Sequence, residues 1–337
     1  MRPGRLDPIR THTRGEAGYT ADMAMGQEVL VLGSGVSGMT TALCLAEAGA
    51  KVRIVTAEPY QRTTSALAGA LWGPYVVNDP RVLEWSIRTL EEVRPLCSLD
   101  RTGVKFVHGG EATRVPMEPP EWLHQFDDFR LSSAAETPPG YIGSWTYSAP
   151  IFDMPVYLRY LDERLRSAAV QVTVLSQPLR SLQEVTPYAK IVVNCTGLGA
   201  RILVPDETLR PSWGQLLVTE NPGLTGFFSD YPEVDEPTYY IAHADHVILG
   251  GCVFGEHVDV ATANAAAVKI RKRCSAIEPR LCGAKILASR SAFRPVRPEV
   301  RLDRTIVDET VIIHNYGHGG SGITLSWGCA RSVQAML

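Results

Sequence analysis

The chain has 337 residues, of which 45% are hydrophobic and 20% charged, and its 33 Lys and Arg residues against 36 Asp and Glu residues give a net charge of −3. This length suits two ordinary domains or one large domain with an insertion. A chain this apolar with so little net charge is not disordered as a whole. Its slightly acidic balance also argues against a nucleic-acid-binding protein.

The seven cysteines are scattered singly along the chain. No C-x-x-C pair occurs, so neither a zinc ribbon nor a redox dithiol is indicated. We interpret these residues as reduced thiols of a cytoplasmic protein. Residues 1–25 contain no apolar segment of the kind that a secretory signal needs, and their Pro, Gly, Thr and charged residues predict a disordered leader.

The first predicted elements are a strand over Val29–Leu32, a helix over Met39–Ala48 and a strand over Lys51–Thr56. The uncharged run that contains the first two is long enough for a membrane helix. Its three glycines divide it, however, so we expect a strand, a tight turn and a helix, and no membrane contact.

The turn itself has the pattern G-x-G-x-x-G, which is typical of dinucleotide binding when a strand precedes it and a helix follows. Gly33 permits the tight turn, Gly35 lets a pyrophosphate approach the backbone, and Gly38 lets the helix pack closely on the strand. The N–H groups at the start of the helix attract the phosphates. Glu58 follows at the distance where an acid accepts hydrogen bonds from ribose hydroxyls. FAD and NAD share this pattern.

Further strand and turn signals follow. Asp153 begins a helix with one apolar face, and the segment 190–197 is a strand that ends in Thr-Gly. Near the C-terminus, a strand over Thr310–Asn315 leads into a second glycine-rich turn and a last helix over Leu325–Met336. An NAD domain normally completes its cofactor site within one contiguous half of the chain. Two distant turns that meet one ligand therefore favour a flavin.

At this point the chain resembles the D-amino-acid oxidase family of flavoproteins. The resemblance extends over nearly the whole chain except residues 1–25. The segments that carry it are Val29–Gly38, Ala68–Tyr75, Val192–Gly197, Phe293–Pro298 and His314–Gly322.

The resemblance implies an α/β fold. A Rossmann-like FAD-binding domain with a parallel central sheet would take residues 26–75, 147–205 and 290–337. It would be interleaved with an α+β substrate domain, built on a mixed or antiparallel sheet, at 76–146 and 206–289. Short β-rich runs between 215 and 254, separated by turn residues, agree with this second part.

The resemblance also implies the substrate contacts. Arg294, in the family's F-R-P motif, would bind the substrate carboxylate with two parallel charge-assisted hydrogen bonds. The hydroxyl of Tyr240 would touch the same carboxylate, and because side chains alternate along a strand, only one of Tyr239 and Tyr240 should point into the site. Gly320 would offer its carbonyl to the amino group, next to Ser321. Three other arginines nearby are expected on the surface: Arg290, Arg297 and Arg301.

The flavin contacts are carried over in the same way. The residues expected to bind FAD are Gly33, Ser34, Gly35, Val36, Ser37, Gly38, Glu58, Thr64, Ser65, Gly69, Ala70, Leu71, Thr196, Gly319, Gly322, Ile323 and Thr324. The FAD is expected to be bound non-covalently. An aromatic residue of the animal enzymes is replaced here by Glu236, which puts a closing lid in doubt.

No acid or base is assigned, because the Cα–H of a neutral amine leaves as a hydride and the cofactor carries that chemistry. Two histidine pairs, His243 with His246 and His314 with His318, each lack a third ligand in the sequence, so no metal is expected.

The resemblance thus implies oxidation of D-amino acids by O2 to 2-oxo acids, ammonia and hydrogen peroxide. Acidic residues along Ser229–Tyr240 favour neutral substrates. The alternatives are a glycine/sarcosine-type oxidase, a D-aspartate oxidase or a catalytically inactive flavin-binding protein. The expected partners are the amino-acid substrate and O2, and a homodimer is a further alternative.

Overall fold

The computed structural model describes residues 26–337 except 76, 231–235 and 256–257, and the expected leader at 1–25 lies outside these described residues. The strands are β1 (Glu28–Leu32), β2 (Lys51–Thr56), β3 (Val104–Thr113), β4 (Arg130–Leu131), β5 (Gly143–Phe152), β6 (Gln171–Val174), β7 (Ile191–Asn194), β8 (Arg210–Glu220), β9 (Phe227–Asp230), β10 (Tyr239–Ala242), β11 (His246–Gly250), β12 (Ile286–Val307) and β13 (Thr310–His318). The α-helices are α2 (Val36–Glu47), α3 (Val82–Val93), α4 (Met154–Ser167), α5 (Ala200–Leu203), α6 (Val260–Ile277) and α7 (Gly322–Gln334).

All these strands belong to one sheet, in the order β4-β5-β3-β9-β10-β11-β8-β12-β13-β7-β1-β2-β6. From β13 to β6 every pair is parallel, as predicted for the nucleotide-binding part. From β4 to β12 the pairs are antiparallel except β3 with β9. The α/β class with a mixed second part is therefore confirmed.

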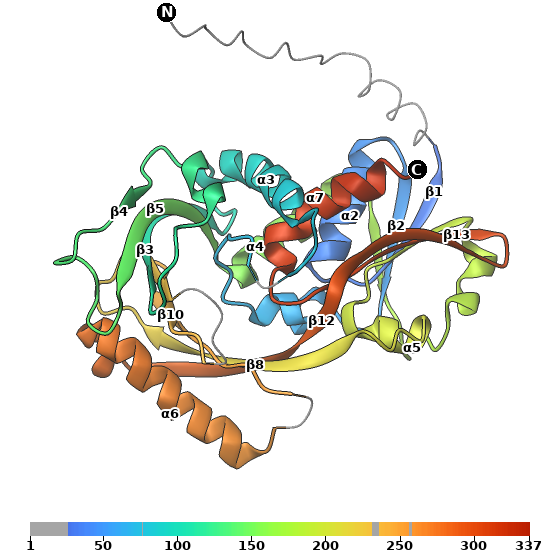
Figure 1. Cartoon of the computed structure of the whole chain (residues 1–337). Coiled ribbons are helices and arrows are strands. Elements are labelled where there is room, and N and C mark those ends of the chain that lie inside the picture. Colours follow the sequence, from blue (N-terminus) through green and yellow to red (C-terminus); the bar gives the residue numbers. More distant parts are fainter. Residues whose placement is uncertain (1–25, 76, 231–235, 256–257) are drawn as a thin grey trace, which may run out of the picture.

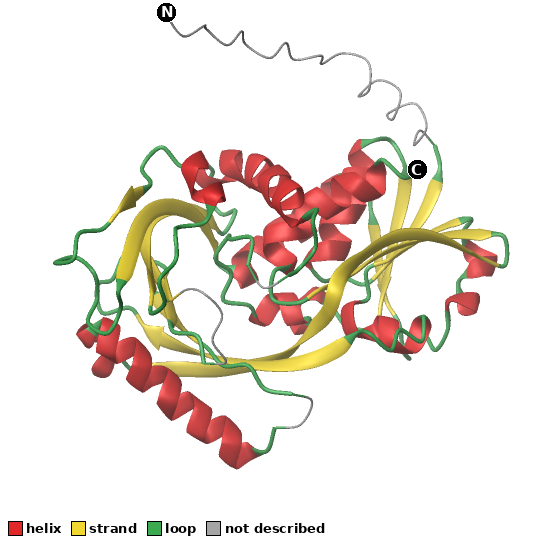
Figure 2. Cartoon of the chain, in the orientation of Figure 1, coloured by secondary structure: helices red, strands yellow, loops and turns green. Residues whose placement is uncertain are grey.

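Strand β12 joins the two parts. Its first half pairs with β8 and its second half with β13, so the sheet runs without a break across the expected domain boundaries at 206 and 290. Figures 1 and 2 show this sheet curving around helices α2, α3, α4 and α7, while α6 lies against the outer side of β8. None of the helices in the described residues combines the length and the apolar character needed to cross a membrane.

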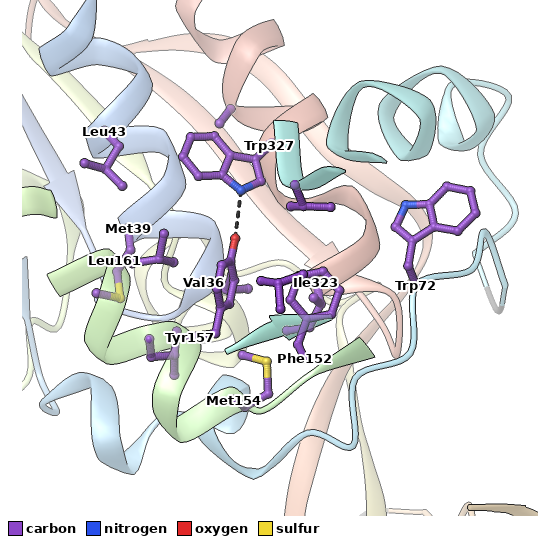
Figure 3. Packing of buried hydrophobic residues seen from close by; sticks show 14 of the residues in the cluster. Val36, Met39, Leu43, Trp72, Phe152, Met154, Tyr157, Leu161, Ile323 and Trp327 are labelled. Atoms are coloured by element: carbon purple, nitrogen blue, oxygen red, sulfur yellow. Dashed lines mark hydrogen bonds between the residues drawn. The ribbon is translucent and has the colours of Figure 1, made fainter. Parts of the chain in front are cut away.

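The core lies between the helices and the sheet. Side chains of α2, α4 and α7 interlock there, and the indole nitrogen of Trp327 donates a 2.8 Å hydrogen bond to the hydroxyl of Tyr157 (Figure 3). Both rings are fully buried. The hydrogen bond therefore gives a partner to the indole N–H and to the tyrosine hydroxyl, which would otherwise both be buried without one. This contact fixes α7 against α4 and with it the second glycine-rich turn.

Both glycine-rich turns are shorter than predicted. α2 begins at Val36 instead of Met39, and α7 begins at Gly322 instead of Leu325. Strand β13 continues to His318, beyond the predicted end at Asn315. The first N–H groups of both helices therefore lie directly at the ends of their strands.

Candidate functional site

One cavity of 1820 Å³, called the main cavity below, is lined by both glycine-rich turns and by β8, β10 and β12. It exceeds the roughly 300–1,000 Å³ of an ordinary small-molecule pocket, as a site for a dinucleotide and a substrate would. It brings together most of the predicted site residues: Gly33, Ser34, Gly35, Val36, Ser37, Glu58, Thr64, Ser65, Gly69, Ala70, Leu71, Thr196, Arg294, Gly319, Gly320, Gly322, Ile323 and Thr324. Gly38, Tyr240 and Ser321 do not line it.

The first glycine-rich turn is too tight for side chains. Gly33 has a φ of +101°, and a Cβ on it would lie 2.6 Å from the carbonyl oxygen of Cys195. A Cβ on Gly38 would lie 2.0 Å from the carbonyl oxygen of Gly33. Gly38 therefore brings the helix onto the strand, as predicted, although it does not face the cavity.

The N-terminus of α2 opens toward the cavity. Its N-cap, Gly35, provides no side-chain hydrogen bond, and its first turn contains no acidic residue. The N–H of Val36 donates a 3.0 Å hydrogen bond to the hydroxyl of Ser65. Nearby, the hydroxyl of Ser34 donates to the carbonyl of Glu58 at 2.8 Å, which ties the turn to the end of β2. This end of the helix carries a partial positive charge and suits an anion.

The second glycine-rich turn is held by hydrogen bonds on both sides. Gly319, with a φ of +54°, donates its N–H to the carbonyl of Pro295 at 2.8 Å. Burial lowers the pKa of His318 to about 4, so this ring is neutral at neutral pH, and it hydrogen-bonds Asn315 at 3.0 Å. The hydroxyl of Ser321 donates to the carbonyl of Tyr75, and Ser321 does not line the cavity. The expectation that Ser321 contacts substrate is therefore corrected.

Arg294 lies on β12, half-buried, with its guanidinium in the main cavity. It donates one hydrogen bond, to the carbonyl of Cys252 at 3.3 Å. Among the described residues no carboxylate lies within ion-pair distance of it. Space for the guanidinium comes from Gly214 on β8, where a Cβ would lie 2.3 Å from both terminal nitrogens. A guanidinium that is half-buried and has no carboxylate partner is suited to bind the anionic group of a ligand.

The tyrosine that faces the main cavity is Tyr239, so the expectation for Tyr240 is wrong. The ring of Tyr239 lies over Gly250, where a Cβ would be 2.0 Å from the ring. Burial raises the pKa of Tyr239, while the charge of Arg294 lowers it, so the hydroxyl stays protonated and can donate. Tyr240 alternates to the opposite face, where its ring lies 6.2 Å from that of Phe228.

Among the polar residues of the cavity that were not predicted as binding residues are Gln215 and Arg290, the second of which was expected on the surface; Asp230, from the acidic stretch expected near the entrance, lines the cavity as well. Gln215 is buried, donates to the hydroxyl of Ser289 at 2.7 Å and leaves its side-chain oxygen without a partner among the described residues. Arg290 lies where the main cavity approaches a smaller one of 340 Å³. Side-chain alternation could have predicted it, because residues four apart on a strand share a face and Arg294 faces the cavity.

The other two arginines expected on the surface are bound inside the fold. Arg297 forms a 2.9 Å ion pair with Asp206, which is almost fully buried. Arg301 donates a 2.9 Å hydrogen bond to the hydroxyl of Tyr316 and pairs with Asp303. Arg304, an exposed arginine further along β12, forms no ion pair or hydrogen bond with another described residue. The surface assignment of Arg297 and Arg301 is therefore corrected.

The two acidic residues of Ser229–Tyr240 that the structure describes are both ion-paired. Asp230 lines the cavity but forms a 2.6 Å ion pair with Arg114 and accepts the N–H of Thr238 at 2.7 Å. Glu236 pairs at 2.9 Å with both Lys269 and Arg273 of α6. Glu233 and Asp235 lie outside the described residues.

A buried carboxyl group lies next to the cavity. Glu111 accepts hydrogen bonds from the hydroxyls of Tyr75 and Tyr147 and from the indole of Trp145. Burial outweighs these three donors and raises the pKa of Glu111 to about 7. Tyr75 lines the main cavity, so one hydrogen-bond donor to this carboxyl group belongs to the cavity wall.

The two histidine pairs differ. His314 is bound to Asn194 and Thr305, so it is not arranged as a ligand. His243 and His246 lie outside the main cavity, beside Asp153. The expectation that this pair lacks a third ligand is therefore wrong.

The donor set of the main cavity suits FAD. The open end of α2 and the hydroxyls of Thr64 and Ser65 face one end of it, and the start of α7 faces another. Glu58 lies at the cavity wall with more than half of its side chain exposed, where it can accept from ribose hydroxyls.

Comparison with known proteins agrees with this geometry. A family model described as FAD dependent oxidoreductase (DAO) matches residues 28–336. The chain is 43% identical over 315 residues to a D-amino-acid oxidase of Rubrobacter xylanophilus, covering 91% of this chain and 94% of that protein. It is 39% identical over 323 residues to a D-amino-acid oxidase of Streptomyces coelicolor, covering 91% and 95%.

Among solved structures, the fold is similar to glycine oxidase from Geobacillus kaustophilus, with a TM-score of 0.72 at 16% identity over 91% of this chain and 94% of that one. This likeness concerns the fold. Together with the family match and the sequence identities, it leads to one conclusion: the chain belongs to the DAO family of FAD-dependent oxidoreductases.

Proposed function

We propose that this protein binds FAD non-covalently in the main cavity and oxidises neutral D-amino acids to 2-oxo acids, ammonia and hydrogen peroxide. The observation that carries the proposal is Arg294, a half-buried guanidinium without a carboxylate partner among the described residues, in the same cavity as both glycine-rich turns. The two relatives named D-amino-acid oxidase support it.

For the cofactor, the N-terminus of α2 and the hydroxyls of Thr64 and Ser65 bind the pyrophosphate, and Glu58 binds the ribose. Gly69, Ala70 and Leu71 border the flavin ring, and the N-terminus of α7 stabilises negative charge on it. When bound, FAD supplies the hydride acceptor and is reoxidised by O2.

For the substrate, Arg294 binds the carboxylate with two parallel hydrogen bonds. The hydroxyl of Tyr239 donates a third hydrogen bond to that carboxylate, in place of the Tyr240 predicted from the sequence. The carbonyl of Gly320 accepts from the amino group. Contacts with Arg294, Tyr239 and Gly320 together orient the Cα–H of the substrate. No side chain is needed as an acid or a base, because the amine enters the site neutral.

We keep the preference for neutral side chains because Arg294 is engaged by the α-carboxylate of the substrate, and the lining residues Arg62 and Asp230 are each paired within the protein, with Glu58 and Arg114. One observation favours the runner-up, a D-aspartate oxidase: Arg290 also lines the cavity and makes no ion pair or hydrogen bond with another described residue. At about 3.3 Å per residue, however, the Cα atoms of Arg290 and Arg294 are separated by about 13 Å along β12. Both guanidinium groups therefore reach one four-carbon diacid only if the two side chains bend toward each other, and because the two relatives named above are D-amino-acid oxidases, we retain the neutral preference.

The test is a peroxide assay on the full chain with D-alanine, D-valine, D-methionine, D-aspartate, glycine, sarcosine and L-alanine. We expect kcat/KM for the best neutral D-amino acid to exceed that for D-aspartate by about tenfold or more, since each 1.4 kcal/mol lost by burying a second carboxylate without a cation of its own gives a factor of ten. A higher value for D-aspartate, glycine or sarcosine would replace the proposed substrate. Absence of peroxide with every substrate, from yellow protein that releases FAD in acid, would identify a flavin-binding protein without this activity.

The seven free cysteines agree with a cytoplasmic location. A homodimer also stays a proposal, and light scattering of the purified protein tests it.

A further inference from the structure

Two histidines and an aspartate from distant parts of the chain meet outside the main cavity. His243 and His246 bracket the turn between β10 and β11, and Asp153 precedes α4. One ligand atom from each of the three lies within 4.8 Å of the other two, and all three side chains are partly exposed. The two imidazole rings stack with centroids 4.7 Å apart and planes 21° apart.

The side chains are free for a ligand. Asp153 occupies the N-cap position of α4, yet its carboxylate accepts no hydrogen bond from the helix. The ring of His243 forms no hydrogen bond with another described residue, and its ring contact is the stack on His246. His246 instead shares a 2.7 Å hydrogen bond through Nδ1 with Asp245. A carboxylate in that position is the usual outer partner of a ligating histidine, because it fixes the ring's orientation.

The backbone holds the three residues in place. The N–H of His243 donates to the carbonyl of His246 at 2.8 Å, and the side chain of Asn221 donates to the carbonyl of His243 at 2.7 Å. The N–H of Asp153 donates to the carbonyl of Gly103 at 2.7 Å. Only side-chain rotations are then required to bring the ligand atoms together, to the separation of about 3.3 Å that bonds of 2.0–2.1 Å to a tetrahedral zinc impose.

We propose that Asp153, His243 and His246 bind a divalent transition-metal ion of the zinc class. Imidazole nitrogens with one carboxylate are ligands that suit Zn²⁺, Ni²⁺ and Cu²⁺ better than Mg²⁺ or Ca²⁺. The carboxylates of Asp153 and Asp245 bring negative charge to the site, which favours a dication. Because the cluster is partly exposed, water completes the coordination.

The site connects two parts of the fold. The hairpin that carries His243 and His246 contains β10, which also presents Tyr239 to the main cavity, whereas Asp153 begins α4. None of the three ligands lines the main cavity. A bound ion therefore stabilises the link between hairpin and helix without taking part in the oxidation, and protein stripped of metal keeps its turnover.

A positive charge near the cluster opposes the binding of a cation. The ammonium of Lys105, on β3, acts electrostatically on His243. It repels a cation and limits the affinity, and Lys105→Gln is expected to strengthen Zn²⁺ binding.

The test uses the full chain, without added histidines, after treatment with a chelator. Zn²⁺ is titrated by calorimetry, and Co²⁺ is titrated by visible absorption, whose d–d bands report the coordination. The variants are Asp153→Asn, His246→Gln and Asp245→Asn, with His124→Gln, an exposed histidine outside the cluster, as the matched control. Asp153→Asn retains a residue favoured at a helix N-cap, so its folding is preserved.

We expect one Zn²⁺ per chain, an affinity about tenfold or more lower in the three cluster variants, and no change in His124→Gln. We also expect the Co²⁺ bands to disappear in Asp153→Asn and His246→Gln. Zn²⁺ should raise the melting temperature of the wild type and of His124→Gln, but not that of Asp153→Asn or His246→Gln. Zn²⁺ binding that is unchanged in folded Asp153→Asn and His246→Gln, or no binding by the wild type, overturns the proposal. Peroxide production by the metal-free wild type is a separate measurement, so failure here is distinguishable from failure of the proposed oxidase activity.

Discussion

Gly214 on β8 leaves the space that the guanidinium of Arg294 on β12 occupies: a Cβ on Gly214 would lie 2.3 Å from both Nη atoms of Arg294 and 2.4 Å from its Cζ. The guanidinium thus occupies the space that any side chain at position 214 would need. Since the clashing atoms are the far end of a flexible side chain, an added methyl group would displace the guanidinium without disturbing the strands.

The variant Gly214→Ala is therefore expected to lower kcat/KM for a neutral D-amino acid by about ten- to a hundredfold, because a shift of about 1 Å misorients the substrate. FAD content and melting temperature should stay near wild type. Steady-state kinetics with flavin absorbance measures both. An unchanged kcat/KM would show that the guanidinium is not held at this position.

Deleting the guanidinium itself should cost more. In Arg294→Leu a desolvated carboxylate loses its partner, at about 3–5 kcal/mol, so kcat/KM should fall by about two to four orders of magnitude. Stopped-flow reduction of the flavin should slow as well. The matched control is Arg304→Leu, exposed on the same strand, which should behave like wild type. Flavin reduction by folded, FAD-containing Arg294→Leu within about threefold of wild type would contradict the carboxylate role.

The tyrosine pair offers an internal control. Tyr239→Phe removes a donor to a charged group, worth about 1.5–3 kcal/mol, so kcat/KM should fall about ten- to a hundredfold. Tyr240→Phe, on the opposite face of β10, should leave kcat/KM within about twofold of wild type. A larger loss in Tyr240→Phe than in Tyr239→Phe would restore the prediction made from the sequence.

This pair also shows where sequence analysis reaches its limit. The strand and the alternation were predicted correctly, but which of two adjacent tyrosines faces the cavity depends on the pairing of β10 with β9 and β11, and a shift of one residue exchanges the faces. By contrast, the glycine-rich turns are local features, in which strand, turn and helix are adjacent in the chain, and they were located to within three residues.

Long-range contacts were beyond prediction for a similar reason. The meeting of Asp153 with His243 depends on the position of the β10–β11 hairpin relative to α4, and no local pattern in either segment encodes it. The length of β12 was missed because its pattern is interrupted by Pro295 and Pro298. Prolines normally mark the end or the edge of a strand, and a register shift between Val296 and Arg301 accommodates them here.

The last prediction concerns Glu111, whose pKa burial raises from 4.5 to about 7. The folded protein then binds this proton more tightly than the unfolded chain does. Its contribution to stability is fully present below pH 4.5 and is lost as the pH rises toward 7, by about 3 kcal/mol in total.

Glu111→Gln removes this titration, since an amide does not ionise in this range. The free energy of unfolding of the wild type minus that of Glu111→Gln should therefore decrease by about 2 kcal/mol or more between pH 5 and pH 8. Hydrogen bonds of Tyr75, Tyr147 and Trp145 to the new amide change the difference by a constant amount that does not depend on pH. Glu136→Gln is the control, because an ion pair with Arg130 lowers the pKa of Glu136 to about 2, so it stays ionised across this window. Urea denaturation at four pH values measures the differences, and a constant value for Glu111→Gln would show that Glu111 is ionised in the folded protein throughout, with the three donors outweighing its burial.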